Sequence, residues 1–241
     1  MTSTVSPADR AKHAAAARAL GFVEDGMKLG LGTGSTAKIF VDLLAERVRT
    51  EGLTLTCVPT SARTRSQAET LGLSVVGLDE AGWLDLTIDG ADEFDEDLNL
   101  IKGGGGALLQ EKIVAAASER MIVVADPAKE VAVLGRFPLP VEIVRFGCGT
   151  TMRLIARLLE RHDVDGRGLH LRRGEEEPYL TDEGHYIVDL DLGRIDDPAR
   201  LNAELNTIPG VVETGLFIGL ASAVIVGEPD GSAMVIQRRS R

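Results

Sequence analysis

The segment KLGLGTGSTAKIF, residues 28–40, determines how the rest of the sequence is interpreted. Its first four residues predict a short strand, and the GTGST motif that follows is a glycine-rich turn. Apolar residues then recur at helical spacing, at Ile39, Leu43 and Val48, which predicts a helix over 37–49. A strand that leads through a glycine turn into a helix is the repeating unit of parallel α/β sheets.

The same unit recurs along the first half of the chain. Ser6-Pro7 provides a serine cap and a proline at the first helical position, so an alanine-rich helix is expected to start there. Further helices are predicted over 61–71 and 107–118, and strands over 53–58, 73–76, 84–88 and 121–125. Strands that alternate with helices imply a doubly wound parallel sheet, so the predicted fold class is α/β.

The sequence changes character after Val131. The motif FPLP at 137–140 breaks the alternation, and a charged stretch at 172–177 interrupts two apolar segments that predict strands. Helices are predicted over 152–159 and 198–205. We therefore predict a smaller α+β domain with an antiparallel sheet and helices on one face. The predicted limits are residues 133–206 for this domain, and 1–132 with 207–241 for the main domain.

Composition excludes several classes of partner. The chain has 241 residues and a formal net charge of -11, which repels nucleic acid and anionic membrane surfaces. No apolar run approaches the roughly 18 residues that a membrane span requires, and no signal-peptide pattern is seen. Cys57 and Cys148 lack metal-type or redox-type spacing and are expected to be buried thiols in a reducing compartment. A cytoplasmic location is expected.

Ligands of open parallel sheets bind beyond the carboxyl ends of the strands, where three polar loops are expected to converge. The first, GTGSTA at 32–37, fits the loose dinucleotide pattern, but the next strand ends without the acid that would hold a ribose. Backbone N–H groups at a helix start, with the hydroxyls of Ser35 and Thr36, instead predict a cradle for one phosphate. The alternative is a tight turn capped by Ser35.

The second loop is KGGGG at 102–106. Each glycine costs roughly 0.5–1 kcal/mol of backbone entropy relative to alanine, and close approach of the backbone to a ligand would explain four in a row. Lys102 in front of them predicts an anion-binding or oxyanion-stabilising corner, and the alternative is a flexible surface loop. The Walker pattern of nucleoside triphosphatases is absent.

Carboxylates are the candidates for proton transfer. Glu111 has apolar neighbours at helical spacing, so it is expected to lose hydration and to exchange a proton near neutral pH; the alternative is a surface glutamate. Asp89 and Asp92, in the third loop, could accept hydrogen bonds from sugar hydroxyls or move a proton between oxygens. The alternative is a set of turn-forming acids, which suits Glu93, Asp95, Glu96 and Asp97 better than Asp89. Lys129 follows a predicted strand end and is a further candidate. The four histidines have no metal-ligand spacing, so no metal is expected.

Several of these motifs, in this order, resemble those of ribose-5-phosphate isomerases of the A type. The resemblance is carried by GTGST at 32–36, DGADE at 89–93, KGGGGAL at 102–108 with Glu111-Lys112, FPLPVE at 137–142, IPGVV at 208–212 and GLF at 215–217. Independent motifs spread over most of the chain are more specific than any single glycine loop. Gln110, His185 and Ser222 depart from residues that are common in the family.

The resemblance implies a Rossmann-like main domain, a smaller ferredoxin-like domain, and assembly as a homodimer or homotetramer. It implies metal-free and cofactor-free interconversion of D-ribose 5-phosphate and D-ribulose 5-phosphate, in the non-oxidative pentose phosphate pathway. Glu111 would move the proton between C1 and C2 through an enediolate, Lys102 would stabilise the oxyanion, and Asp89 would assist ring opening. The implied substrate-binding residues are Thr33, Gly34, Ser35, Thr36, Asp89, Gly90, Ala91, Asp92, Lys102, Gly103, Gly104, Gly105 and Lys129.

Three other functions remain open at the level of sequence. An amino-sugar-phosphate deaminase or a coenzyme A transferase could share the broad fold, and the transferase would use its glutamate as a covalent nucleophile. A sugar-phosphate sensor would bind without turnover. A sensor that regulates transcription needs a module that reads DNA, and none is evident in this acidic chain.

Overall fold

The computed structural model describes residues 6–238, and the chain divides into two compact units. The first unit comprises the chain up to Ala91, Gln110–Glu130 and the segment from Leu220 onward. The second comprises Asp92–Leu109 and Val131–Gly219. The units differ from the predicted domain limits because strands within residues 92–109 and 207–219 pair with other strands of the second unit.

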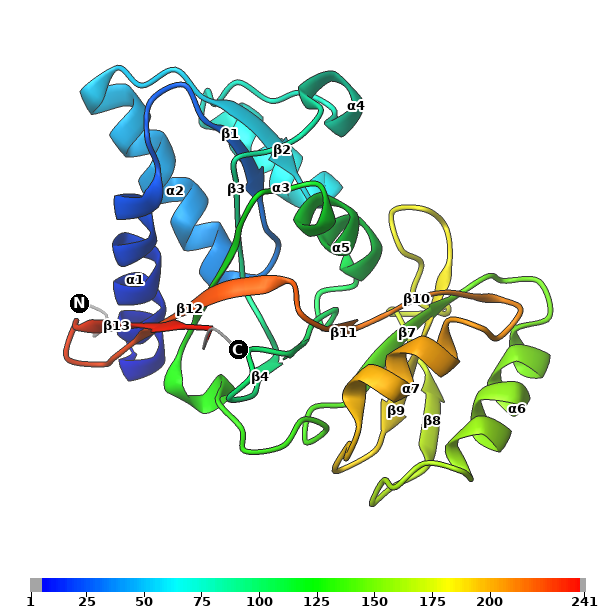
Figure 1. Cartoon of the computed structure of the whole chain (residues 1–241). Helices are drawn as coiled ribbons and strands as arrows, with labels where there is room; N and C mark the ends of the chain where they lie inside the picture. Colours follow the sequence, from blue (N-terminus) through cyan, green and yellow to red (C-terminus); the bar gives the residue numbers. More distant parts are fainter. Residues whose placement is uncertain (1–5, 239–241) are drawn as a thin grey trace. The chain divides into compact units, whose positions relative to one another are not determined.

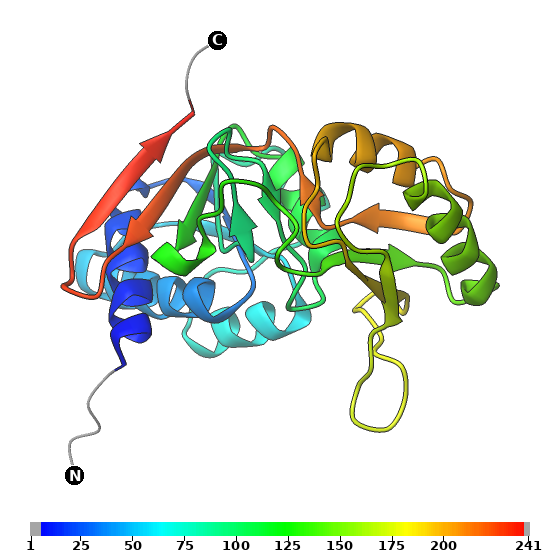
Figure 2. The same ribbon diagram turned by 90° about the horizontal axis from the view of Figure 1, so that it is seen from below.

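The first unit is built on a six-stranded sheet. Its order is β13-β12-β6-β3-β1-β2, and all neighbours are parallel except β12 and β13 (Figure 1). The strands are β1 Lys28–Leu31, β2 Thr56–Pro59, β3 Leu86–Asp89, β6 Met121–Ala125, β12 Ala221–Gly227 and β13 Ala233–Gln237. Figure 2 shows β13 at the edge of this sheet, beside β12. The predicted α/β class is confirmed.

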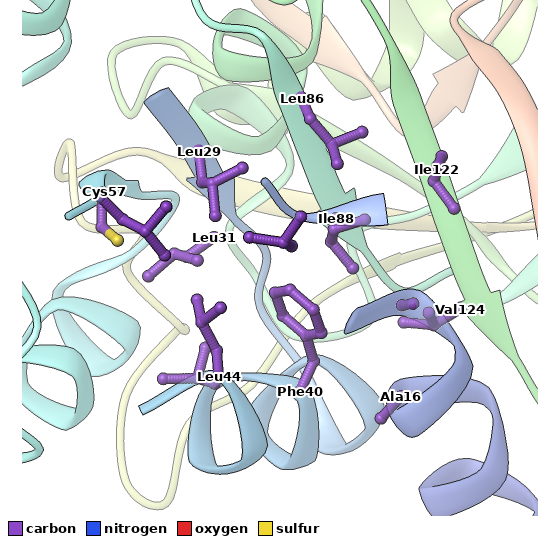
Figure 3. Close-up of a cluster of buried hydrophobic side chains, with 14 of the residues drawn as sticks. Ala16, Leu29, Leu31, Phe40, Leu44, Cys57, Leu86, Ile88, Ile122 and Val124 are labelled. Carbon is purple, nitrogen blue, oxygen red and sulfur yellow. The ribbon is translucent and has the colours of Figure 1, made fainter. Parts of the chain in front are cut away.

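Helices cover both faces of this sheet, as in a doubly wound fold. They are α1 Pro7–Ala19, η1 Leu20–Phe22, α2 Ser35–Glu51, α3 Ala62–Thr70, α4 Leu78–Ala81, α5 Leu108–Ala116 and η2 Pro127–Lys129. On one face Ala16 of α1 and Phe40 of α2 pack against Leu31 and Ile88 of the strands (Figure 3). On the other face Val114 of α5 packs in a separate cluster with residues of β2 and α4. The helix α5 begins in the second unit and continues in the first.

The local signals in the sequence act as expected at several helix starts. Ser6 accepts a hydrogen bond from Asp9 N ahead of Pro7, and Ser61 accepts from Thr64 N at the start of α3. The predicted strand over 73–76 is wrong, because only an isolated bridge joins Val75 to β2.

The second unit contains a βαββαβ arrangement. Its elements are β7 Leu139–Ile143, α6 Cys148–Leu159, β8 Gly168–Leu171, β9 Tyr186–Asp191, α7 Pro198–Leu205 and β10 Val211–Thr214. The strands form an antiparallel sheet in the order β10-β7-β9-β8, which is the ferredoxin-like arrangement. Ile155 of α6 and Leu201 of α7 share one core with Val141 and Val188, so both helices cover one face, as predicted.

A small three-stranded sheet completes the second unit. It has the order β11-β5-β4, with β4 Glu93–Phe94, β5 Leu100–Ile101 and β11 Leu216–Phe217. This pairing is the reason that segment 92–109 belongs to the second unit.

The FPLP motif was expected to end the alternation of strands and helices, and it leads into β7 of the antiparallel sheet, a strand that includes Pro140. The Pro140 carbonyl accepts from Gly215 N at 2.7 Å, so the proline nitrogen faces the side on which β10 has already ended. Because no partner strand needs an N–H there, the strand tolerates proline.

Both cysteines are free. Cys57 is buried, and burial raises the pKa of its thiol to about 12. Cys148 is partly exposed, so the expectation of two buried thiols holds for Cys57 alone. Within residues 6–238, no helix has both the length and the apolar character needed to cross a bilayer.

Candidate active site

The switch point of the first sheet lies between β1 and β3. The chain leaves β1 for β2 on one side and returns to β3 on the other side. Ligands of doubly wound sheets bind beyond the strand ends at such a point. The turn 32–36 follows β1, and Asp89–Ala91 is the end of β3 and its continuation, so the fold brings two predicted loops to this edge.

Asp89 is fully buried and bound to the turn after β1. Its Oδ1 accepts hydrogen bonds from Thr33 N at 3.0 Å and from Gly90 N at 2.7 Å. A Cβ atom at Gly32 would overlap the Asp89 carboxyl group and its Cα atom. Gly32 is therefore required for the carboxylate of Asp89 to approach β1, a reason that the sequence pattern did not indicate.

Gly32→Ala is expected to destabilise the protein by about 1–3 kcal/mol and to lower any activity that depends on Asp89, because the new methyl group must displace the carboxylate. Urea unfolding measures the loss of stability. Gly77→Ala is the matched control, since a Cβ there has no neighbour within 4 Å and Gly77 has φ of -80°. Equal stabilities of the two variants would contradict the prediction.

The side chain of Thr33 is held inside the first unit. Its Oγ1 lies 2.9 Å from Thr60 Oγ1, 2.8 Å from Ser61 Oγ and 3.1 Å from Thr64 Oγ1. These four residues, here called the hydroxyl cluster, are all buried. Sequence reasoning missed three of them, and its one signal was Ser61, which was expected only as a helix cap. The hydroxyl cluster fixes the turn 32–36 against the end of β2.

The start of α2 is open to an anion. Gly34 is the N-cap residue, with φ of 115°, and no side chain caps this helix end. The alternative in which Ser35 caps the turn is wrong, because Ser35 is the first helical residue. Gly34 and Ser35 are exposed and line a cavity of about 690 Å³, to which Lys38 and Arg63 also contribute. Uncapped N–H groups beside two cations suit a phosphate.

Glu111 lies in the first turn of α5 and is 4% exposed. The alternative of a surface glutamate is therefore wrong. Its helical neighbours Val114 and Ala115 are buried as well. Burial removes the water that would otherwise hydrate the carboxylate, which is the environment that the predicted proton transfer requires.

Lys102 is 2% exposed and belongs to the second unit. Its backbone N–H donates to Gly215 O at 2.9 Å, and its Nζ lies 5.5 Å from the centroid of the Phe217 ring. Close by in the chain, Asp92 Oδ2 accepts from Gly104 N at 2.7 Å. The second unit thus brings Asp92 and the glycine turn together.

Protein side chains explain most of the glycine run. A Cβ at Gly104 would lie 2.8 Å from the Asp92 carboxylate and 3.0 Å from the Phe137 ring, and one at Gly106 would overlap the Tyr179 hydroxyl. Gly103 has φ of 102°, which side-chain-bearing residues rarely adopt. Internal packing and the backbone conformation at Gly103 therefore require glycine at these three positions, and the approach of a ligand to the run stays a prediction.

For Glu93 the alternative of a turn-forming acid is wrong, because its side chain is a buried anchor. Its Oε2 accepts from Gly135 N at 2.8 Å and its Oε1 from Phe137 N at 2.6 Å. The carboxylate is fully buried on β4 and joins the FPLP segment to the small sheet. In the sequence, Glu93 stood out only as part of the DGADE motif at 89–93.

Lys129 is half-buried on η2, after the carboxyl end of β6.

Three histidines pair with carboxylates: His162 with Glu204, His170 with Asp191 and His185 with Glu142. Ser222, one of the residues that depart from the family pattern, donates a hydrogen bond from its hydroxyl to Met121 O on the neighbouring strand β6.

Glu142 is a buried carboxyl group in the second unit. Its Oε1 accepts from Thr181 Oγ1 and lies 2.9 Å from His185 Nδ1. Burial raises the pKa of Glu142, and the hydrogen bonds from His185 and Thr181 act in the opposite direction. The folded protein therefore keeps this proton to a higher pH than the unfolded chain does.

The stability contributed by that proton is present below the unfolded pKa and is lost as pH rises through the raised folded pKa. Glutamine keeps the shape of the neutral side chain and cannot ionise. The parent should lose stability above about pH 4.5 and Glu142→Gln should not, so the unfolding free energy of the variant minus that of the parent is expected to grow as pH rises. Urea unfolding from pH 4.5 to 8 measures this difference. Glu175→Gln, on the exposed stretch of the same unit, should show no such trend. A pH-independent difference for Glu142→Gln would refute the prediction.

The predicted residues divide between the units. In the first unit lie Thr33–Thr36, Asp89–Ala91, Glu111 and Lys129, and in the second lie Asp92 and Lys102–Gly105. Thr33 and Gly90 both donate a hydrogen bond to Asp89, and separately Gly104 donates to Asp92. The class that the fold and these residues define is a Rossmann-like α/β protein with a buried glutamate on α5 and an uncapped helix start that suits a phosphate.

Comparison with known proteins gives the particular family. The family model for ribose 5-phosphate isomerase A (phosphoriboisomerase A) matches residues 56–231. A ribose-5-phosphate isomerase A of Cereibacter sphaeroides strain KD131 is 62% identical over 231 residues, covering 96% of this chain and 88% of that protein. The chain belongs to the ribose 5-phosphate isomerase A family.

Solved structures agree with the fold. The structure of ribose 5-phosphate isomerase A from Methanocaldococcus jannaschii has a TM-score of 0.87 at 37% identity and covers 94% of this chain and 97% of that one. A D-ribose-5-phosphate isomerase in complex with phospho-erythronic acid has a TM-score of 0.88 at 37% identity and covers 96% and 99%.

Proposed function

We propose that this protein is a ribose-5-phosphate isomerase that interconverts D-ribose 5-phosphate and D-ribulose 5-phosphate. Membership of the family and 62% identity to a named isomerase over 96% of the chain support the activity. The reaction is an aldose–ketose isomerisation and belongs to the non-oxidative pentose phosphate pathway.

Glu111 acts as the base in this proposal. It takes the proton from C2 of the open-chain aldose and returns it to C1 of the enediolate, and the reverse reaction uses the same steps. The single observation that carries the assignment is that this carboxylate is 4% exposed on α5 in the first unit. A carboxylate shielded from water can pass a proton between two carbons without losing it to bulk solvent.

Lys102 stabilises the negative charge that develops on the substrate oxygen, and its burial strengthens that electrostatic effect. Asp89 assists ring opening and proton exchange on oxygen, and its contacts with Thr33 and Gly90 hold it in one orientation. The phosphate binds at the uncapped start of α2. The proposed substrate-binding residues are Thr33, Gly34, Ser35, Thr36, Asp89, Gly90, Ala91, Asp92, Lys102, Gly103, Gly104, Gly105 and Lys129.

The ligand of one structural relative supports this substrate class. Phospho-erythronic acid, bound to a protein 37% identical to this one, is a phosphorylated sugar acid. Its carboxylate carries two oxygens on one planar carbon, and an enediolate likewise has two oxygens on a planar carbon framework. A site that accepts such a molecule suits the charge distribution of the proposed intermediate.

An isomerase assay with ribose 5-phosphate after exhaustive chelation tests the proposal and its metal independence. Formation of ribulose 5-phosphate at the untreated rate is the expected result. Binding of ribose 5-phosphate without turnover would support a sensor instead. A trapped thioester on a glutamate after incubation with an acyl-coenzyme A would support a transferase.

We further propose that the protein is cytoplasmic and assembles as a homodimer or homotetramer. Light scattering of the purified chain tests the assembly, and a monomer at micromolar concentration would refute it.

A further inference from the structure

The glycine turn of the second unit is held by an arginine that lies far away in the sequence. Arg172 Nη1 donates to Gly103 O at 2.8 Å and lies 3.3 Å from Gly104 O. Arg172 directly follows β8, and its backbone N–H donates to Ile187 O of β9 at 2.8 Å. One side chain therefore holds two successive carbonyl groups of the turn.

Arg172 is itself held in one orientation. Its Nε lies 2.9 Å from Asp189 Oδ2, and its Nη2 bonds to Asp189 Oδ1. The side chains of Arg172 and Asp189 are 15% and 22% exposed. Two parallel charge-assisted hydrogen bonds fix the plane of a guanidinium group. The Tyr179 ring, 5.9 Å away, packs beside it. The remaining donors of Arg172 are thereby aimed at the turn.

The carbonyl contacts also determine where the N–H groups of the turn point. In a trans peptide the C=O and the following N–H point in opposite directions, and no cis peptide occurs in residues 6–238. The Gly103 C=O is held by Arg172, and the N–H of the same peptide, on Gly104, donates to Asp92. In the next peptide the Gly104 C=O faces Arg172, so the N–H of Gly105 points away from Arg172. Gly105 is exposed.

We infer that Arg172, held by Asp189, is a positioning residue for the proposed isomerisation. It fixes two peptides of the turn that follows Lys102 and so sets the direction of the Gly105 N–H, a donor for a substrate oxygen. The inference rests on the proposed function, in which residues 102–105 bind the substrate. It requires the planar fork of arginine, because the single ammonium of lysine cannot hold Asp189 at two points and the turn as well.

Arg172→Gln is expected to lower kcat about tenfold to a hundredfold, as a displaced substrate-binding turn does, and to change KM by less than about threefold. Arg172→Lys should not restore kcat. The matched control is Arg173→Gln, since Arg173 is the next residue and is exposed, and it should keep the parent values. Amide hydrogen exchange of a peptide covering 102–108 should become faster in Arg172→Gln and remain unchanged in Arg173→Gln.

A double-mutant cycle separates positioning from a general structural role. In a Lys102→Met background, Arg172→Gln should lower kcat by a smaller factor than it does in the parent, because both residues act through one turn. The same factor in both backgrounds, or parent kcat in Arg172→Gln, would overturn the inference. If Arg172→Gln does not fold, Asp189→Asn should show the same loss of kcat and the same faster exchange, and parent behaviour in both would overturn it.

Separate outcomes test the proposed function and the role of Arg172. A parent protein that does not isomerise ribose 5-phosphate would overturn the proposed function and this inference with it. An active parent whose Arg172 and Asp189 variants are unaffected would overturn the inference alone.

Discussion

Glu111→Gln is expected to lower kcat for ribose 5-phosphate by about 10²–10⁴-fold, with KM within about threefold of the parent. Glutamine fills the same buried position but cannot accept a proton, so the chemical step is lost while phosphate binding, which we propose at the start of α2, continues. Steady-state kinetics measure both constants. Binding of the substrate, measured by calorimetry, should survive the substitution.

The control lies a few residues further along. Glu119→Gln changes an exposed glutamate just beyond the end of α5 and should leave kcat and KM unchanged. Since Glu111 is 4% exposed, the unfolding free energy of both variants should also be measured. A Glu111→Gln variant that turns over at the parent rate would show that another group moves the proton.

Lys102→Met is the second substitution with a large expected effect, a fall in kcat of about 10²–10³-fold. The methionine side chain keeps much of the apolar stem of lysine, so it can occupy the space beside the Phe217 ring without the charge. The loss should appear in kcat and in kcat/KM, because the oxyanion exists only along the reaction path.

Lys28→Met is the control for charge removal, since Lys28 is at the start of β1, at the other end of the strand from the turn 32–36. It should retain the parent kcat. A Lys102→Met variant in which KM rises and kcat is unchanged would mean that Lys102 binds the ground state and does not stabilise the oxyanion.

The main features of the fold could be predicted from the sequence where short apolar runs and turn or cap residues indicate the same element. The strand at Lys28–Leu31 and the strand at Met121–Ala125 are short apolar runs next to a glycine turn or a helix end, and both were predicted with their observed limits. The strand β7 could not be predicted, since its proline is tolerated only because β10 ends beside it. That reason depends on pairing between distant segments.

In the candidate site, too, features of a single segment could be predicted and contacts between distant segments could not. The burial of Glu111 could be predicted because its apolar neighbours repeat at helical spacing within one segment. The roles of Thr60, Glu93 and Arg172 could not be found, because each contacts residues at least 27 positions away. The requirement for Gly32 was likewise hidden, since it arises from Asp89 on a neighbouring strand.

A chain of hydrogen bonds connects the hydroxyl cluster to the backbone of the turn 32–36. Thr33 donates to Ser61, Ser61 to Thr64, and Thr64 to the Gly32 carbonyl. A carbonyl oxygen can only accept, so the hydrogen bond from Thr64 to Gly32 has a fixed direction, whereas either hydroxyl can donate in the contacts of Thr33 with Thr60 and Thr64. These bonds hold the turn that we propose to bind the phosphate, so its backbone should superimpose closely in ligand-free and ligand-bound crystals.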